Sequence, residues 1–176
     1  MSKKKILAIV GSAGANSSNH RLVQYIDQVI SSEFEVTILA DLKIYPHFDP
    51  EASTNAPPPE IVDLRNQISA SDGVIICTPE YVFSIPSGLK NVIEWCVSTT
   101  VFSDKPVGLI TASASGEKGH EELQLIMSTI MAKLIPETSL LIQGIKGKID
   151  NEGTIIDQAT KADVERFIDA FKTLIS

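Results

Sequence analysis

Residues 6–19 read ILAIVGSAGANSSN, an unbroken apolar run followed by a loop of small and polar residues. A short apolar run that ends at a glycine is typical of a strand buried on both faces, as in a parallel sheet. After Asn19 the apolar residues at 22, 23, 26, 29 and 30 fall on one face of a helix. The stretch therefore predicts a buried strand, a polar loop and an amphipathic helix, in that order.

The same unit recurs along the rest of the chain. The strands that we expect are residues 6–10, 35–40, 74–77, 107–110 and 139–142. The helices that we expect are residues 19–30, 61–68, 86–97, 123–134 and 164–174, with a long loop at 41–59 and an irregular excursion at 143–156. This alternation predicts an α/β fold, a parallel sheet with helices on both faces. No linker or low-complexity segment divides the chain, so we expect one domain over residues 1–176.

The composition of the chain limits the kinds of molecule that we expect it to bind. The chain has 176 residues and a net charge of -7, which disfavours nucleic acid and anionic membrane surfaces as partners. It does not exclude an anionic cofactor, because backbone N–H groups bind phosphate whatever the net charge. The two cysteines, Cys77 and Cys96, do not form the pattern of a disulfide framework. We expect them to be reduced thiols of a cytoplasmic protein. No apolar run has the length of a membrane helix.

Three loops follow predicted strands, at residues 11–19, 78–86 and 111–119. Ligands of open α/β sheets bind beyond the carboxyl ends of the strands, which is where these loops lie. The first loop combines glycines, hydroxyls and an amide before a helix, a pattern suited to a phosphate monoester. It also fits a polar loop that only caps its helix, and it matches neither the P-loop nor the Gly-x-Gly-x-x-Gly motif. Asp41 could meet a ribose in a dinucleotide fold, but an aspartate there is also ordinary turn chemistry.

The other two loops suit a flat ligand. Tyr81 and Phe83 could lie against an aromatic ring, or they could cover the core. The loop after residue 111 has only small residues before Glu117, which leaves room for a ligand but also fits a flexible connection. His120 is a candidate acid or base, although a capping or solvent-exposed histidine is the commoner case. No second His or Cys stands at metal-ligand spacing, so we expect no metal site.

The loop sequences resemble those of the NADPH-dependent FMN reductase family. The resemblance rests on Gly11-Ser12 with Ser17 and Asn19, on Thr78-Pro79-Glu80-Tyr81, on Ser84-Ile85-Pro86, and on residues 89–95, LKNVIEW. It spans nearly the whole chain, and the segment from Pro79 to Asn91 is its most specific part. The family includes quinone, azo-dye and chromate reductases. It implies a flavodoxin-like, five-stranded parallel sheet in the order 2-1-3-4-5.

The resemblance also implies a set of FMN-binding residues. Ser12, Ser17 and Asn19 would hold the phosphate, Pro79, Glu80, Tyr81 and Ser84 would border the isoalloxazine and ribityl chain, and Ser113, Ser115 and Gly116 would line the other edge. Family members are usually dimers or tetramers, so a homo-oligomer is expected. The sequence departs from the family pattern at Gly14, where arginine is common, and at Val82, where asparagine is common.

The implied activity is that of an NAD(P)H-dependent oxidoreductase. NADPH or NADH would pass a hydride to bound FMN, and a small acceptor (a flavin, quinone, azo compound or metal oxyanion) would then take the electrons in the same place. This scheme requires no acid–base side chain, which suits a sequence without an evident one. The alternatives are an electron-transfer flavodoxin-like carrier without turnover, or a binding module that holds no flavin.

Overall fold

The computed structural model of the chain describes residues 3–14 and 16–176, so Ala15 of the first loop lies outside the described residues. Its centre is a parallel sheet in the order β2-β1-β3-β4-β5. The strands are β1 (Lys4–Val10), β2 (Phe34–Leu39), β3 (Gly73–Thr78), β4 (Val107–Ser113) and β5 (Ser139–Gln143). The expected order is confirmed. The register pairs Ala8 with Ile75, and Ile75 with Gly108, across the three central strands.

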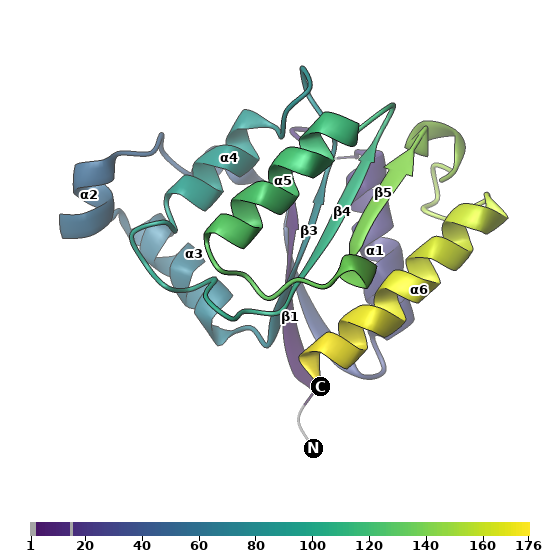
Figure 1. Cartoon of the computed structure of the whole chain (residues 1–176), viewed down its shortest axis with the longest axis horizontal. Coiled ribbons are helices and arrows are strands. Elements are labelled where there is room, and N and C mark those ends of the chain that lie inside the picture. Colours follow the sequence, from purple (N-terminus) through teal and green to yellow (C-terminus); the bar gives the residue numbers. More distant parts are fainter. Residues whose placement is uncertain (1–2, 15) are drawn as a thin grey trace.

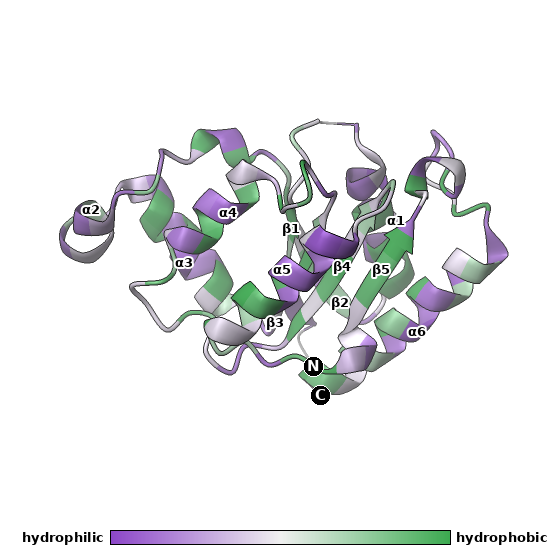
Figure 2. Ribbon diagram, turned by 45° about the horizontal axis from the view of Figure 1, so that its top comes forward, coloured by the Kyte–Doolittle hydropathy of each residue, from purple (hydrophilic) through white to green (hydrophobic). Residues whose placement is uncertain are grey.

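Helices cover both faces of the sheet (Figure 1). They are α1 (Ser18–Ile30), α2 (Pro50–Asn55), α3 (Pro59–Ala70), α4 (Ser87–Glu94), α5 (Glu117–Thr129) and α6 (Gln158–Ile175). Successive residues of a strand point to opposite faces. Ile6 and Ala8 accordingly join a core with α1 and α6, whereas Leu7 and Ile9 join a core with α3, α4 and α5. Figure 2 shows the apolar strands between helices whose outer sides are hydrophilic.

The predicted loop at 41–59 contains regular structure. A 3-10 turn (Leu42–Ile44) and helix α2 lie within it. Asp49 caps α2 by accepting hydrogen bonds from the N–H groups of Glu51 and Ala52, both at 2.9 Å. Asn91 and Trp95 hold the start of the segment, since both side chains donate to the carbonyl of Pro46. The prolines therefore delimit α2 rather than prevent a helix.

Helix α5 differs from the expected helix at 123–134. It begins at Glu117 and ends at Thr129, so Leu134 lies beyond it. The end is a Schellman motif: the Ala132 N–H donates to the Met127 carbonyl and the Met131 N–H to the Ser128 carbonyl, both at 3.0 Å. Met131 occupies the position with φ 62° at which glycine is usual. Strand β4 also continues to Ser113, which shortens the third loop.

All five carboxyl ends of the strands lie at one edge of the sheet, because the strands are parallel. The start of β1 and the C-terminus lie at the other end of the molecule (Figure 1). Within the part of the chain that the structure describes, no helix combines the length and apolar character needed to cross a membrane.

Candidate functional site

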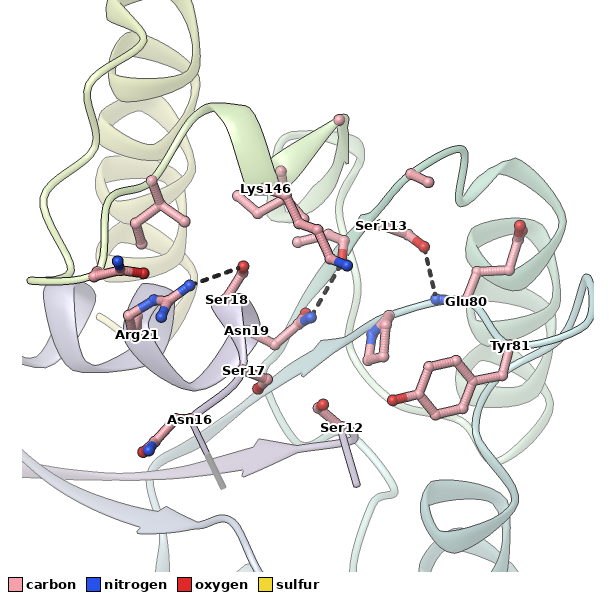
Figure 3. Close-up of a pocket in the computed structure, with 17 residues that line it drawn as sticks. Ser12, Asn16, Ser17, Ser18, Asn19, Arg21, Glu80, Tyr81, Ser113 and Lys146 are labelled. Atoms are coloured by element: carbon pink, nitrogen blue, oxygen red, sulfur yellow. Dashed lines mark hydrogen bonds between the residues drawn. The ribbon is translucent and has the colours of Figure 1, made fainter. Parts of the chain in front are cut away.

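A cavity of about 720 Å³ opens at the carboxyl edge of the sheet, within the size range of small-molecule sites. Figure 3 shows its lining side chains, which come from the first loop, α1, the ends of β3 and β4, and the segment after β5. The lining residues are Ser12, Asn16, Ser17, Ser18, Asn19, Arg21, Pro79, Glu80, Tyr81, Ala112, Ser113, Ala114, Gly144, Ile145, Lys146, Ile149 and Asn151. The cavity thus joins all three loops that the sequence singles out.

The first loop leaves β1 at a point of close contact. A side chain on Gly11 would place its Cβ 2.4 Å from Thr78 Oγ1, so only glycine lets the loop pass the end of β3. Ser17 caps α1, its Oγ accepting from the His20 N–H at 3.1 Å. The N–H groups of Ser18 and Asn19 begin the helix and have no partner in the preceding turn of that helix. Hydroxyls and helix N–H groups therefore face the cavity together.

Asn19 is buried and its side chain is occupied. Its Nδ2 donates to the Ala112 carbonyl at 3.0 Å, and its Oδ1 accepts from the Cys77 thiol at 3.3 Å. The side chain therefore ties α1 to β3 and β4, and it leaves the second Nδ2–H and the backbone N–H as the donors that Asn19 can offer to a ligand. The sequence predicts Asn19 in the site, but it does not reveal this structural role.

The second loop is fixed to the start of α5 by Glu80. The Glu80 carboxylate accepts from the N–H of Gly116 at 3.3 Å and from that of Gly119 at 2.9 Å, so it caps α5 from another loop. The Glu80 N–H donates to Ser113 Oγ at 3.2 Å. Gly116 has φ 89°, a conformation that favours glycine. These contacts set the distance between the second and third loops.

Residues 81–84 form a tight turn that projects from the cavity. Tyr81 and Ser84 exchange two backbone hydrogen bonds, of 2.9 and 3.1 Å. Val82 and Phe83 between them have φ of 51° and 60° and are 93% and 76% exposed. Ser84 turns towards α5, where its Oγ donates to Glu122 Oε2 at 2.5 Å. Tyr81 alone of these side chains faces the cavity (Figure 3).

The structure brings together most of the predicted site residues. Those that line the cavity are Ser12, Ser17, Asn19, Pro79, Glu80, Tyr81 and Ser113. Ser84, Ser115 and Gly116 do not line it. Ser84 is hydrogen-bonded to α5, and Gly116 gives its N–H to Glu80. The binding roles of the whole set remain predictions.

His120 is neither solvent-exposed nor a cap. It is buried, with Nδ1 at 2.8 Å from Thr111 Oγ1 and Nε2 at 3.1 Å from Ser139 Oγ, and burial lowers the pKa of its imidazole. It does not line the cavity. Cys77 and Cys96 are buried free thiols, as expected, and burial raises both pKa values, that of Cys96 to about 12. None of these groups is placed to act on a ligand.

The cavity also includes residues that the sequence did not single out. Arg21 lies in the first part of α1, and Lys146 and Asn151 come from the segment expected to be an irregular excursion. A signal for Lys146 existed, because it follows the carboxyl end of the fifth strand, where ligands bind in this fold class. Arg21 had no such signal, since a single arginine on a helix is ordinarily a surface residue.

The arrangement suits an anionic ligand with a flat part. Arg21, Ser17 and Ser18 lie on one side of the cavity, and Tyr81 lies on the other (Figure 3). Lys146 and Pro79 also line it. Glu80 is the one carboxylate among the described lining residues, and backbone N–H groups already bind it. The site can bind and orient, but it presents no evident nucleophile or general base.

Comparisons with known proteins agree with this chemistry. The family model described as NADPH-dependent FMN reductase matches residues 4–146. NADH:(hydroxy)cinnamate reductase subunit CrdA of Vibrio ruber is 31% identical, over 94% of this chain and 84% of its own. The quinone reductase of Escherichia coli K12 is 29% identical, over 98% of this chain and 96% of its own. The solved structure of FerB, a flavoenzyme NAD(P)H:(acceptor) oxidoreductase from Paracoccus denitrificans, superposes with a TM-score of 0.82 at 26% identity and covers 98% of this chain and 97% of its own.

Proposed function

Because the chain belongs to the NADPH-dependent FMN reductase family and is an NAD(P)H-dependent flavin oxidoreductase, we propose that the cavity at the carboxyl edge holds its FMN and that a quinone or a free flavin is its acceptor. The observation that carries this proposal is the joint position of the first loop and the loop of Pro79–Tyr81 on one cavity. An azo compound or a metal oxyanion is the less supported acceptor, since relatives named for quinone reduction cover nearly the whole chain.

The residues present fit FMN. A phosphate monoester requires several donors, and the hydroxyls of Ser12 and Ser17 and the N–H groups at the start of α1 provide them. Arg21 adds a buried Nε–H that has no hydrogen-bond partner among the described residues. A flat ring system requires a firm wall, which Pro79 and Tyr81 can form. We assign the phosphate to the first group and the ring to the second.

FMN, when bound, supplies the redox chemistry: NAD(P)H gives up a hydride, and the acceptor gains two electrons and two protons, one of them from solvent. The protein positions the reactants. Ser113 and Glu80 hold the second and third loops at a fixed spacing, so the wall at Tyr81 does not collapse. Ser84 and Gly116 do not line the cavity, and they act indirectly, through the hydrogen bonds that hold these loops.

Steady-state oxidation of NADH and NADPH, with a water-soluble quinone as acceptor, tests the proposal. We expect turnover that depends on added FMN and saturates at one FMN per chain. A protein that binds FMN without turnover would be an electron carrier, and a protein that binds no flavin would be a binding module. Either result would contradict the proposal.

We further propose that the chain acts as one domain over residues 1–176, in the cytoplasm, and as a homodimer or homotetramer. The exposed apolar side chains of Val82 and Phe83 support self-association, because they project beside the cavity without cover from the described part of the chain. Two buried, unpaired cysteines support a reducing compartment.

A further inference from the structure

The basic side of the cavity lies where α1 meets the segment after β5. Arg21 and Lys146 line the cavity there (Figure 3), and Asn151 of the same segment as Lys146 is also a lining residue. This segment is held in place by a small hairpin, in which Ile149 pairs with Ile155 and both side chains are buried in the core of α1 and α6. Asn151 lies within this hairpin, and Lys146 lies in the 3-10 turn just before it (Ile145–Gly147), whose Ile145 is buried in the same core.

Arg21 has unused hydrogen-bonding capacity. Its Nη2 donates to Ser18 Oγ at 3.3 Å, a weak contact, and its Nε is buried without a partner. A guanidinium carries five N–H donors in a planar fork that matches the oxygens of a phosphate. A buried donor without a partner is unfavourable for folding, so such a group in a ligand cavity is often one that the ligand satisfies.

Neither cation has a carboxylate partner among residues 3–14 and 16–176. The ion pairs among the described residues involve other side chains, and no hydrogen bond there involves the Lys146 amine. The chain as a whole has a net charge of -7, whereas the described lining of this cavity holds two cationic side chains and one carboxylate, Glu80. The first loop itself, residues 11–19, contains no Lys or Arg. Any cationic contact to a ligand at the start of α1 must therefore come from elsewhere.

We propose that Arg21 and Lys146 bind a phosphate monoester dianion at this side of the cavity. Two reactants carry such a group: FMN, as its terminal phosphate, and NADPH, as its 2′-phosphate. The position of Arg21 beside Ser17 and Ser18 favours FMN. The inference rests on the proposed function, since both sources are reactants of that activity.

The test compares flavin affinities of the full-length protein and single variants. Arg21→Gln and Lys146→Gln should each weaken FMN binding by about tenfold and leave riboflavin binding unchanged, because riboflavin lacks the phosphate. Arg166→Gln and Lys148→Gln are the controls, since they remove the same charges from positions that do not line the cavity. Arg21→Lys should retain more FMN affinity than Arg21→Gln.

The possible outcomes distinguish the phosphate of FMN from the 2′-phosphate of NADPH. If FMN binding is unchanged but the KM for NADPH rises and that for NADH does not, the phosphate is that of the donor, and the phosphate site stands. If the variants weaken FMN and riboflavin equally, or change neither FMN binding nor the KM for NADPH, the inference is overturned. Lys146 is exposed, so its variant tests the proposal even if Arg21→Gln does not fold. Failure of the wild-type protein to bind either flavin would contradict the proposed function instead.

Discussion

Val82 occupies a backbone conformation that β-branched residues rarely adopt. Its φ of 51° and that of Phe83, 60°, are typical of the centre of a type I′ turn, where Asn and Gly prevail. We expect Val82→Asn to raise the free energy of unfolding by about 1 kcal/mol, because Asn tolerates the left-handed region. Urea unfolding measures the change. Val97→Asn is the control, since Val97 is also exposed but has no positive φ, and an equal gain there would contradict the explanation.

His120 makes stability depend on pH. Burial lowers the pKa of its imidazole in the folded chain, so between that pKa and the ordinary value of about 6.5 the unfolded chain binds the proton and the folded chain does not. Stability should therefore fall as pH drops below about 6.5, by less than about 1.4 kcal/mol per pH unit. The variant His120→Gln should lack this part of the pH dependence, because glutamine does not titrate. Urea unfolding at several pH values measures the difference in free energy of unfolding between the wild type and His120→Gln. This difference should become smaller as the pH falls below about 6.5. A difference that stays the same at every pH would contradict this role of His120.

The roles of some residues could be predicted from the sequence, and those of others could not. Serines before a helix predict a cap, and Ser17 is one. The orientation of Ser84 and the bonds of Asn19 depend on partners 38 and 93 positions away, which no local pattern encodes. Gly14 has open space around it and no positive φ, so an arginine could stand there without strain.

Two carboxylates join helix α5 to the second loop. One belongs to the loop and accepts hydrogen bonds from α5, and the other belongs to α5 and accepts hydrogen bonds from the loop. Glu80 of the loop caps α5, and Glu122 of α5 accepts from Ser84 Oγ and from the Ile85 N–H at 3.0 Å. Glu80→Gln should lower the free energy of unfolding by about 1 kcal/mol, since a neutral amide caps a helix less well than a carboxylate.

The matched control for this helix is Glu121→Gln. Glu121 is exposed on α5, and its one ion pair in the described part of the chain is with Lys118, so the substitution should change the free energy of unfolding by less than about 0.5 kcal/mol. Thermal or urea unfolding of both variants decides the question. Equal effects of the two substitutions would show that the Glu80 cap contributes nothing beyond surface charge.

The central elements could be predicted because their signals are local and strong. The central strands β1, β3 and β4 are largely apolar on both faces, and the predicted start and end of each strand lie within a few residues of those observed. The ends of α5 could not be predicted, since a Schellman motif with Met131 in place of glycine has no sequence signature. Helix α2 was missed because the prolines around it usually indicate a loop, and its hydrogen bonds to Ser98, in the turn after α4, join residues that are distant in sequence.

At the scale of the whole molecule, the exposed turn at Val82 and Phe83 predicts assembly. We expect light scattering at micromolar concentration to give at least twice the mass of one chain. Phe83→Ser should shift the mass towards a single chain, because it removes a ring that is 76% exposed. Ile156→Ser, on the segment before α6 and 57% exposed, should not. A wild-type mass of one chain would contradict the prediction.

The layout of the molecule explains why the sequence predicts the position of the site better than its chemistry. Parallel strands bring all their carboxyl ends to one edge, so the three loops had to meet. The charge of the cavity comes from α1 and from the segment after β5, and only the folded chain places Arg21 and Lys146 together.

The central claim is that this chain holds FMN and reduces it with a nicotinamide. The most direct measurement is anaerobic: protein loaded with FMN is mixed with one equivalent of NADH or NADPH, and the visible flavin absorption is followed. We expect the absorption to bleach with one nicotinamide consumed per flavin, and to return when a quinone is added. Absorption that persists in the presence of both donors would contradict the claim.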